Sequence, residues 1–181
     1  YGRADTVMHL LPFRFAHVLE WFSGKRFEDI IKIYAAAGGT PRYLEFFSGE
    51  DVRDDIEENF FSQSFLFYDA RKVLEEELRE PVRYFMILEA IAKGRNTTNE
   101  IKNFTGLESN TLPFYMGKLK RLKLVTTEKS VIQPKKQHYV INDNYLKFWF
   151  RFVYPYEDYI DSMMPEAAVG QFKKGFNTYL G

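Results

Sequence analysis

Two adjacent glycines followed by threonine and proline force one helix to end and another to begin. Residues 26–37 carry apolar side chains at helical spacing, and Gly38 or Gly39 can adopt the left-handed conformation that closes a helix. Thr40 is then a good N-cap. Pro41 suits the first helical position because its missing N–H would be unpaired there anyway. The sequence therefore predicts a sharp helix–helix junction at this point.

An arginine occupies the first turn of the second helix. Arg42 places a cation where it opposes the helix macrodipole, at a cost of about 0.3–1 kcal/mol. A helix N-terminus with free N–H groups and an adjacent cation is, however, a favourable place to hold phosphate. The alternative is a well-capped junction with an exposed arginine, and the pattern alone leaves both interpretations open.

The composition is that of a folded protein. Apolar residues make up 45% of the 181 residues and aromatic residues 18%, which is enough for a hydrophobic core. The chain has no cysteine, which excludes disulfides, thiolate zinc sites and cysteine nucleophiles. No window approaches about 18 consecutive apolar residues, so no membrane span is predicted, and we expect a cytoplasmic protein.

The first 80 residues are predicted to form mainly a helical bundle. Residues 6–10 have the pattern of a short strand, which we expect to be the last of a sheet whose other strands are missing. Pro81 opens a new helix, and we place a domain boundary close to it. Periodicity and capping residues predict the helices of this half at about 15–22, 26–37, 41–47, 51–61 and 65–79.

Residues 81–142 have the pattern of three helices and a β-hairpin. Thr97 and Glu100 form a capping box at the start of a short second helix, and a turn at Gly106 separates it from the third. Two short helices joined by a turn with glycine are typical of a helix-turn-helix. Two strands, with a wing between them, are predicted at 123–128 and 137–141. The segment resembles a winged helix-turn-helix domain.

The C-terminal segment, 143–181, is predicted to be helical and is unusually aromatic. Its aromatic residues do not share one face of a helix, and a helix that is apolar all round needs partners on more than one side. We expect some of those partners to be missing and an exposed aromatic patch to result. A last helix is predicted at about 166–180. The aromatic residues are Tyr145, Phe148, Trp149, Phe150, Phe152, Tyr154, Tyr156 and Tyr159.

Five short motifs occur in a fixed order. They are Tyr-Gly-Arg-Ala-Asp at 1–5, Leu-Pro-Phe-Arg-Phe at 11–15, Gly-Gly-Thr-Pro-Arg-Tyr-Leu at 38–44, Glu-Pro at 80–81 with Tyr84, and the aromatic run at 145–152. Together they resemble the C-terminal half of the archaeal-type ATPases, P-loop proteins of the AAA+/STAND kind. The Gly-x-x-x-x-Gly-Lys-Ser/Thr loop and the apolar strand with paired acidic residues, which such proteins need, are absent. We therefore expect the catalytic half to lie upstream.

The resemblance implies a nucleotide-binding role for the glycine junction. Gly39, Thr40 and Pro41 would line the base or ribose. Arg42 would act as a sensor arginine near the phosphates, and Arg3 would reach a phosphate from the core side. The implied cofactor is ATP, with Mg in the full-length protein, and no ATP binding is expected for this chain alone. The resemblance also implies a nuclease-like domain downstream and is compatible with an oligomer.

The expected fold class is mostly α, with a helical lid-like bundle, a winged helix-turn-helix domain with a β-hairpin wing, and C-terminal aromatic helices. The expected divisions are the end of a P-loop core at 1–24, the lid-like domain at 25–80, the winged helix at 81–142 and the C-terminal helices at 143–181.

Charge is unevenly distributed although the net charge is zero. Residues 1–80 hold 16 acidic and 10 basic side chains, whereas residues 81–145 hold 5 acidic and 11 basic ones. The winged segment is thus near +6 beside an acidic segment near −6. Such asymmetry is typical of a module that faces nucleic acid, and equally of two parts of one protein that attract each other.

A winged helix that binds double-stranded DNA would read bases near the N-terminus of its third helix, where Asn110 is the best candidate for a bidentate adenine contact. Later cations would contact phosphates. The alternative is a winged helix that packs against the nucleotide-binding core and reports its state. The candidate DNA-binding residues are Asn110, Thr111, Tyr115, Lys118, Lys120, Arg121, Lys129, Lys135 and Lys136.

No catalytic residue and no metal site are predicted within the chain. No nucleophile with a base and an orienting group can be assembled, and no histidine has metal-ligand spacing. The leading hypothesis is the lid and winged-helix portion of an ATP-binding switch protein. The alternative is a free-standing winged-helix DNA-binding transcriptional regulator in which residues 1–80 serve for dimerisation.

Overall fold

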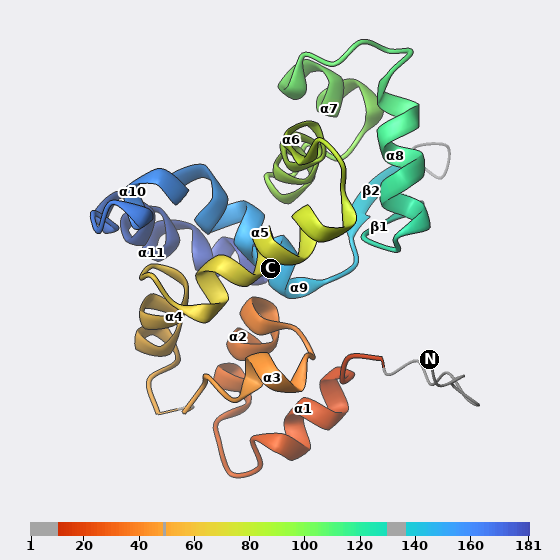
Figure 1. The fold of residues 1–181 in the computed structure, drawn as a ribbon. Helices are drawn as coiled ribbons and strands as arrows, with labels where there is room; N and C mark the ends of the chain where they lie inside the picture. The colour runs from red at the N-terminus through yellow and green to blue at the C-terminus, as the bar shows by residue number, and fades with distance from the viewer. Residues whose placement is uncertain (1–10, 49, 130–136) are drawn as a thin grey trace, which may run out of the picture.

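The computed structural model of the chain describes residues 11–48, 50–129 and 137–181 (Figure 1). The described chain is mostly helical and contains one antiparallel two-stranded hairpin, which confirms the predicted fold class. The strand predicted at 6–10 lies outside the described residues. Among the described helices, none is both long and apolar enough to cross a membrane.

The first half forms the helices that the capping residues predict. The Asp51 carboxylate accepts hydrogen bonds from two backbone N–H groups of the following turn, and the Ser64 hydroxyl accepts one from Phe67 N. The helix predicted over 41–47 is shorter than expected, because the chain turns at Glu45 through i→i+3 bonds. The helices are α1 (Phe15–Trp21), α2 (Phe27–Ala37), α3 (Pro41–Leu44), α4 (Val52–Phe60) and α5 (Phe65–Glu77).

The next segment, which we call the winged unit, has three helices and the hairpin. Thr97 and Glu100 make both hydrogen bonds of the predicted capping box, and Gly106 ends the second helix with a φ of 69°. The hairpin pairs Val125 with Ile141, and Tyr139 N donates to Asn96 O. The elements are α6 (Pro81–Ala92), α7 (Thr98–Thr105), α8 (Leu112–Arg121), β1 (Val125–Lys129) and β2 (Gln137–Ile141).

The C-terminal segment is helical except for a turn before its last helix, and its helix type changes three times, from α to π, from π to 3₁₀ and back to α. An α-helix passes directly into a π-helical stretch and then into a 3₁₀ turn. The last helix spans the residues that the sequence predicts. The elements are α9 (Asn144–Phe148), η1 (Trp149–Val153), η2 (Tyr154–Tyr156), α10 (Glu157–Asp161) and α11 (Glu166–Leu180).

The expected exposed aromatic patch is wrong for most of this segment. Phe148, Trp149 and Phe150 are fully buried, because α2, α5, α6 and α11 of the same chain surround α9 and η1. The Trp149 indole N–H donates to Phe67 O at 2.8 Å, and the Tyr145 hydroxyl donates to Leu66 O at 2.8 Å. The aromatic run is therefore the centre of one hydrophobic cluster that reaches from the first helices into the winged unit.

Candidate functional site

Glycine is required at the two positions of the predicted junction for different physical reasons. Gly38 ends α2 with φ 68° and ψ −147°, a conformation that favours glycine. Gly39 is needed because of its neighbour: its carbonyl accepts a hydrogen bond from Phe13 N at 2.7 Å. A Cβ at Gly39 would lie 1.9 Å from Phe13 O. Pro41 occupies the first turn of α3 as predicted, whereas Thr40 makes no side-chain cap.

The opposite side of the junction contacts the chain where it leaves the winged unit. Asn144 Nδ2 donates to Tyr34 O at 3.1 Å, at the end of α2. A Cβ at Gly38 would lie 3.5 Å from Tyr145 N. The rings of Tyr43 and Tyr145 have their centroids 4.4 Å apart. The junction is therefore held between residue 13 on one side and α9 on the other.

Half-buried and buried polar groups stabilise this contact. The Tyr43 hydroxyl donates to Asp69 Oδ2 at 2.5 Å, and burial together with this bond raises the pKa of Tyr43 far above its ordinary value. Burial also raises the pKa of Tyr145. Asp143 caps α9 by accepting from Leu146 N at 2.9 Å. Burial raises the pKa of Asp143, although backbone N–H groups at the start of α9 oppose that shift.

Arg42 lies on the outer side of the junction. Its Nη1 donates to Glu45 Oε2 at 2.6 Å, and the two side chains are 63% and 50% exposed. The guanidinium also lies over the rings of Phe46 and Phe65, at 5.1 and 5.6 Å from their centroids. The predicted sensor arginine is therefore engaged with its own helix turn in this structure.

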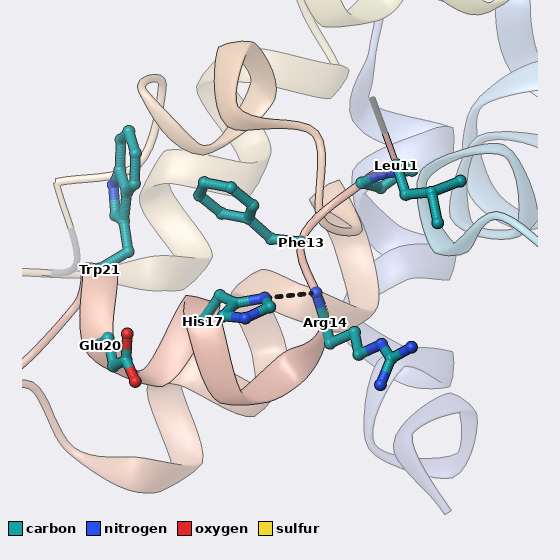
Figure 2. Close-up of a pocket in the computed structure, with 7 residues that line it drawn as sticks. Leu11, Phe13, Arg14, His17, Glu20 and Trp21 are labelled. Atoms are coloured by element: carbon teal, nitrogen blue, oxygen red, sulfur yellow. Dashed lines mark hydrogen bonds between the residues drawn. The ribbon is translucent and has the colours of Figure 1, made fainter. Parts of the chain in front are cut away.

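A hollow of about 630 Å³ lies beside the segment that pairs with Gly39 (Figure 2). Phe13 is its centre, with the ring of Trp21 at 5.8 Å and that of His17 at 5.7 Å. His17 Nδ1 accepts from Arg14 N at 3.2 Å, and the Arg14 guanidinium points away from the rings. Sequence reasoning missed this hollow, whose signal is the spacing of four residues between Phe13, His17 and Trp21. Its lining residues are Leu11, Pro12, Phe13, Arg14, His17, Glu20 and Trp21.

The nucleotide-binding residues that the resemblance implies are only partly covered by the described residues. The one cation predicted for the phosphates that lies within them, Arg42, is paired with Glu45. Arg3 lies outside the described residues. In the described ranges, no group of three or more His, Asp or Glu side chains is placed to hold a metal ion.

The candidate base-reading residues differ in how exposed they are. Asn110 is exposed in the turn before α8. Thr111 is half-buried, and its hydroxyl donates to Glu108 O at 3.0 Å. Tyr115 is buried: its hydroxyl accepts from Arg83 Nη1 at 2.6 Å, and its ring meets that of Tyr84 at 5.0 Å. Tyr115 thus belongs to the core of the winged unit rather than to its outer face.

The candidate phosphate contacts lie at the end of α8 and on the hairpin. Lys118, Lys120 and Arg121 occupy the last turn of α8, and the Lys120 ammonium lies 5.0 Å from the centroid of the Tyr139 ring. Lys129 is exposed at the end of β1. Lys135 and Lys136 lie outside the described residues.

Comparison with known proteins finds a similar protein but assigns the chain to no family. No family model matches the chain, and no solved structure matches it. It is similar to uncharacterized protein MJECL04 of Methanocaldococcus jannaschii, with 32% identity over 192 aligned residues. The match covers all of this chain and 42% of that protein, so the chain spans less than half the length of this relative.

Proposed function

We propose that the chain is the C-terminal portion of an ATP-binding protein of the archaeal ATPase type, in which the glycine junction couples nucleotide state to the position of the winged unit. One observation carries this proposal: three of the motifs behind the resemblance meet at one place. Residue 13 bonds to Gly39, and the junction 38–44 packs on Tyr145, the first residue of the aromatic run. A displacement on one side of the junction must then be accommodated on the other.

The role proposed for Arg42 is an exchange of partners. An exposed ion pair such as that with Glu45 is worth only about 0–1 kcal/mol, so leaving it costs little. A polyphosphate held by an upstream core would offer the guanidinium a stronger, bidentate partner. Gly39, Thr40 and Pro41 would line the base or ribose, as the resemblance implies. ATP, with Mg, would supply the anionic group to which the arginine responds.

The length of the relative is compatible with this proposal. More than half of the Methanocaldococcus jannaschii protein lies outside the match, which leaves room there for a P-loop core. A nuclease-like domain downstream remains part of the proposal on the same grounds of resemblance.

A free-standing DNA-binding regulator is the second candidate. Its support is the basic end of α8, where the described residues form no ion pair with Lys118, Lys120 or Arg121. Against it, the first helices bury apolar residues on α9 and η1 of the same chain rather than keeping them for a dimer interface. We therefore favour the switch protein.

The test is nucleotide binding by the natural protein that contains this chain. We expect calorimetry to detect binding of ATP with Mg, and Arg42→Ala to weaken it about tenfold or more, as for loss of a charged hydrogen bond. Lys72→Ala, which removes an exposed cation from α5, is the matched control. Equal affinities for the two variants would reject the sensor role. Micromolar ATP affinity of the 181-residue chain alone would contradict an upstream phosphate cradle.

A further inference from the structure

Large apolar side chains are exposed together where α10 ends and the chain turns toward α11. Tyr159, Met163 and Met164 are 53%, 77% and 53% exposed. Isolated exposed apolar residues are common, but several neighbouring ones are typical of an interaction surface. Methionine side chains are flexible and make favourable contacts with aromatic rings. The end of α10 therefore has the character of a surface that packs against an apolar group of a partner.

The backbone of Met163 makes its exposure more informative. Its φ is 58°, in the left-handed region that glycine adopts freely and methionine does not. Met164 N donates to Tyr159 O at 2.8 Å, the bond of a helix end at which glycine is the usual residue. Glu80 and Lys123 also have positive φ, but their side chains are polar. At Met163 the chain keeps an apolar side chain in solvent where glycine would relieve strain, which indicates that this side chain has a role.

Carboxylates flank these apolar side chains. Asp158, Asp161 and Glu166 are all exposed, and none of the cations in the described ranges forms an ion pair with them. Asp161 Oδ1 accepts from the Tyr68 hydroxyl at 2.8 Å, a bond that leaves its charge uncompensated. We call the three apolar side chains and these three carboxylates the acidic corner. Its charge fits a partner that presents an apolar ring among cations.

The other end of the molecule presents a surface of that kind. On α8, Phe114 is 68% exposed, and Lys118 and Arg121 follow it on the same side of the helix. We call these three residues the basic face; no described carboxylate forms an ion pair with either cation. Figure 1 shows α8 and α10 at opposite sides of the molecule. One copy of the chain can therefore use both surfaces at the same time.

We infer that the partner of the acidic corner is a second copy of this chain, which docks its basic face there. Phe114 of one copy packs on Met163 and Met164 of the next, and the two cations of the basic face meet the carboxylates of the corner. A contact between two different surfaces repeats from copy to copy, so it gives a closed ring or an open row rather than a dimer. The contact needs no nucleotide, so its failure would leave the proposed function unaffected.

Analytical ultracentrifugation of the 181-residue chain without nucleotide measures this contact. We expect the average mass to grow past that of two copies as concentration rises, and to fall when added salt screens the charges. Met163→Gly relieves the left-handed conformation, so it should keep or raise the melting temperature and yet weaken association about tenfold. Glu80→Gly is the matched control, because it relieves a φ of 55° outside both surfaces and should leave association unchanged.

Mixing two variants tests the head-to-tail arrangement. Phe114→Ala combined with Arg121→Glu removes the basic face and keeps the acidic corner, whereas Met163→Gly weakens the corner and keeps the basic face. Each should associate weakly alone, and an equal mixture should recover the affinity of the natural contact but stop at two copies. A natural chain that stays monomeric at about 100 μM, whether or not α8 then binds a DNA duplex, would overturn the inference. So would full association by Met163→Gly, or a mixture that associates no better than its components.

Discussion

The acidic helical half and the end of α8 in the basic winged unit differ in how their cations are paired. In the helical half, Arg42 is paired with Glu45, and Asp29 accepts from both Arg26 and Lys32. Arg71 bonds to Glu75 and to Glu157 of the C-terminal segment. At the end of α8, by contrast, no described carboxylate pairs with the cations.

The difference follows from the local supply of carboxylates. Arg26, Lys32 and Arg42 each have an acidic residue within one helical turn, whereas Lys118, Lys120 and Arg121 have none. Lys93, the cation at the end of α6 that follows Glu89 by four residues, is paired with it. A cation at a candidate binding position therefore indicates a ligand only when no neighbouring carboxylate pairs with it. The cations at the end of α8 have no described carboxylate partner, whereas a ligand of Arg42 must compete with Glu45.

The largest expected effect concerns the contact between the junction and α9. Tyr145→Ala removes a buried ring that contacts Tyr43 and leaves a cavity, and we expect a loss of about 3–5 kcal/mol in the free energy of unfolding. Tyr145→Phe keeps the ring, removes the hydroxyl that donates to Leu66 O and should cost about 1 kcal/mol. Urea denaturation measures both. Equal losses for the two variants would show that the ring contact is not what holds the junction.

The two halves should also differ in their glycines. Gly39→Ala forces a Cβ against Phe13 O, and overpacking of this kind costs about 1–3 kcal/mol. Gly117→Ala meets open space in a helix and should stabilise the protein by up to about 1 kcal/mol. Thermal and urea unfolding of both variants would establish the signs. If Gly39→Ala left the free energy of unfolding unchanged, the close contact between Gly39 and Phe13 O would not be what requires a glycine in the junction.

What the sequence predicts well is local. The capping box at Thr97, the turn at Gly106 and the last helix depend on neighbours within a few residues, and all three are confirmed. The burial of Trp149 depends on helices that are distant in sequence, so periodicity alone led to the wrong expectation of an exposed patch. The ion pair between Arg42 and Glu45 can be predicted from the sequence, because residues three apart on a helix are neighbours.

The candidate sites were less predictable because they depend on which side of a helix faces outward. Tyr115 was chosen for its position near the start of α8, yet the core of the winged unit needs it. Phe114, one residue earlier, has the exposed position. A shift of one residue rotates a helix position by about 100°, so a small error in the predicted face exchanges a core residue for a surface one.

A smaller effect with a pH signature is expected at Asp143. Burial raises the pKa of Asp143, so the folded protein holds this proton more tightly than the unfolded chain does. Stability from this group is therefore lost as pH rises through the interval between the unfolded and folded pKa values. Asp143→Asn can still accept the bond from Leu146 N. It should stabilise the protein at pH 7.

The gain from Asp143→Asn should decrease as pH falls and disappear near about pH 3, where the carboxyl group is protonated in both states. Urea unfolding of both proteins at a series of pH values measures it. A difference between the two proteins that does not vary with pH would mean that the charge of Asp143 is not what destabilises the start of α9.

The smallest effects are expected where the two halves are compared directly, at Arg42 and Arg121. Arg42→Ala removes an exposed ion pair and two ring contacts and should lower stability by no more than about 1 kcal/mol. Arg121→Ala removes no described ion pair and should change stability by less than about 0.5 kcal/mol. Adding salt should reduce the first effect, because screening weakens an exposed ion pair. If Arg121→Ala proved the more destabilising, the cations of α8 would serve the fold, and the charge of the winged unit would no longer indicate a partner.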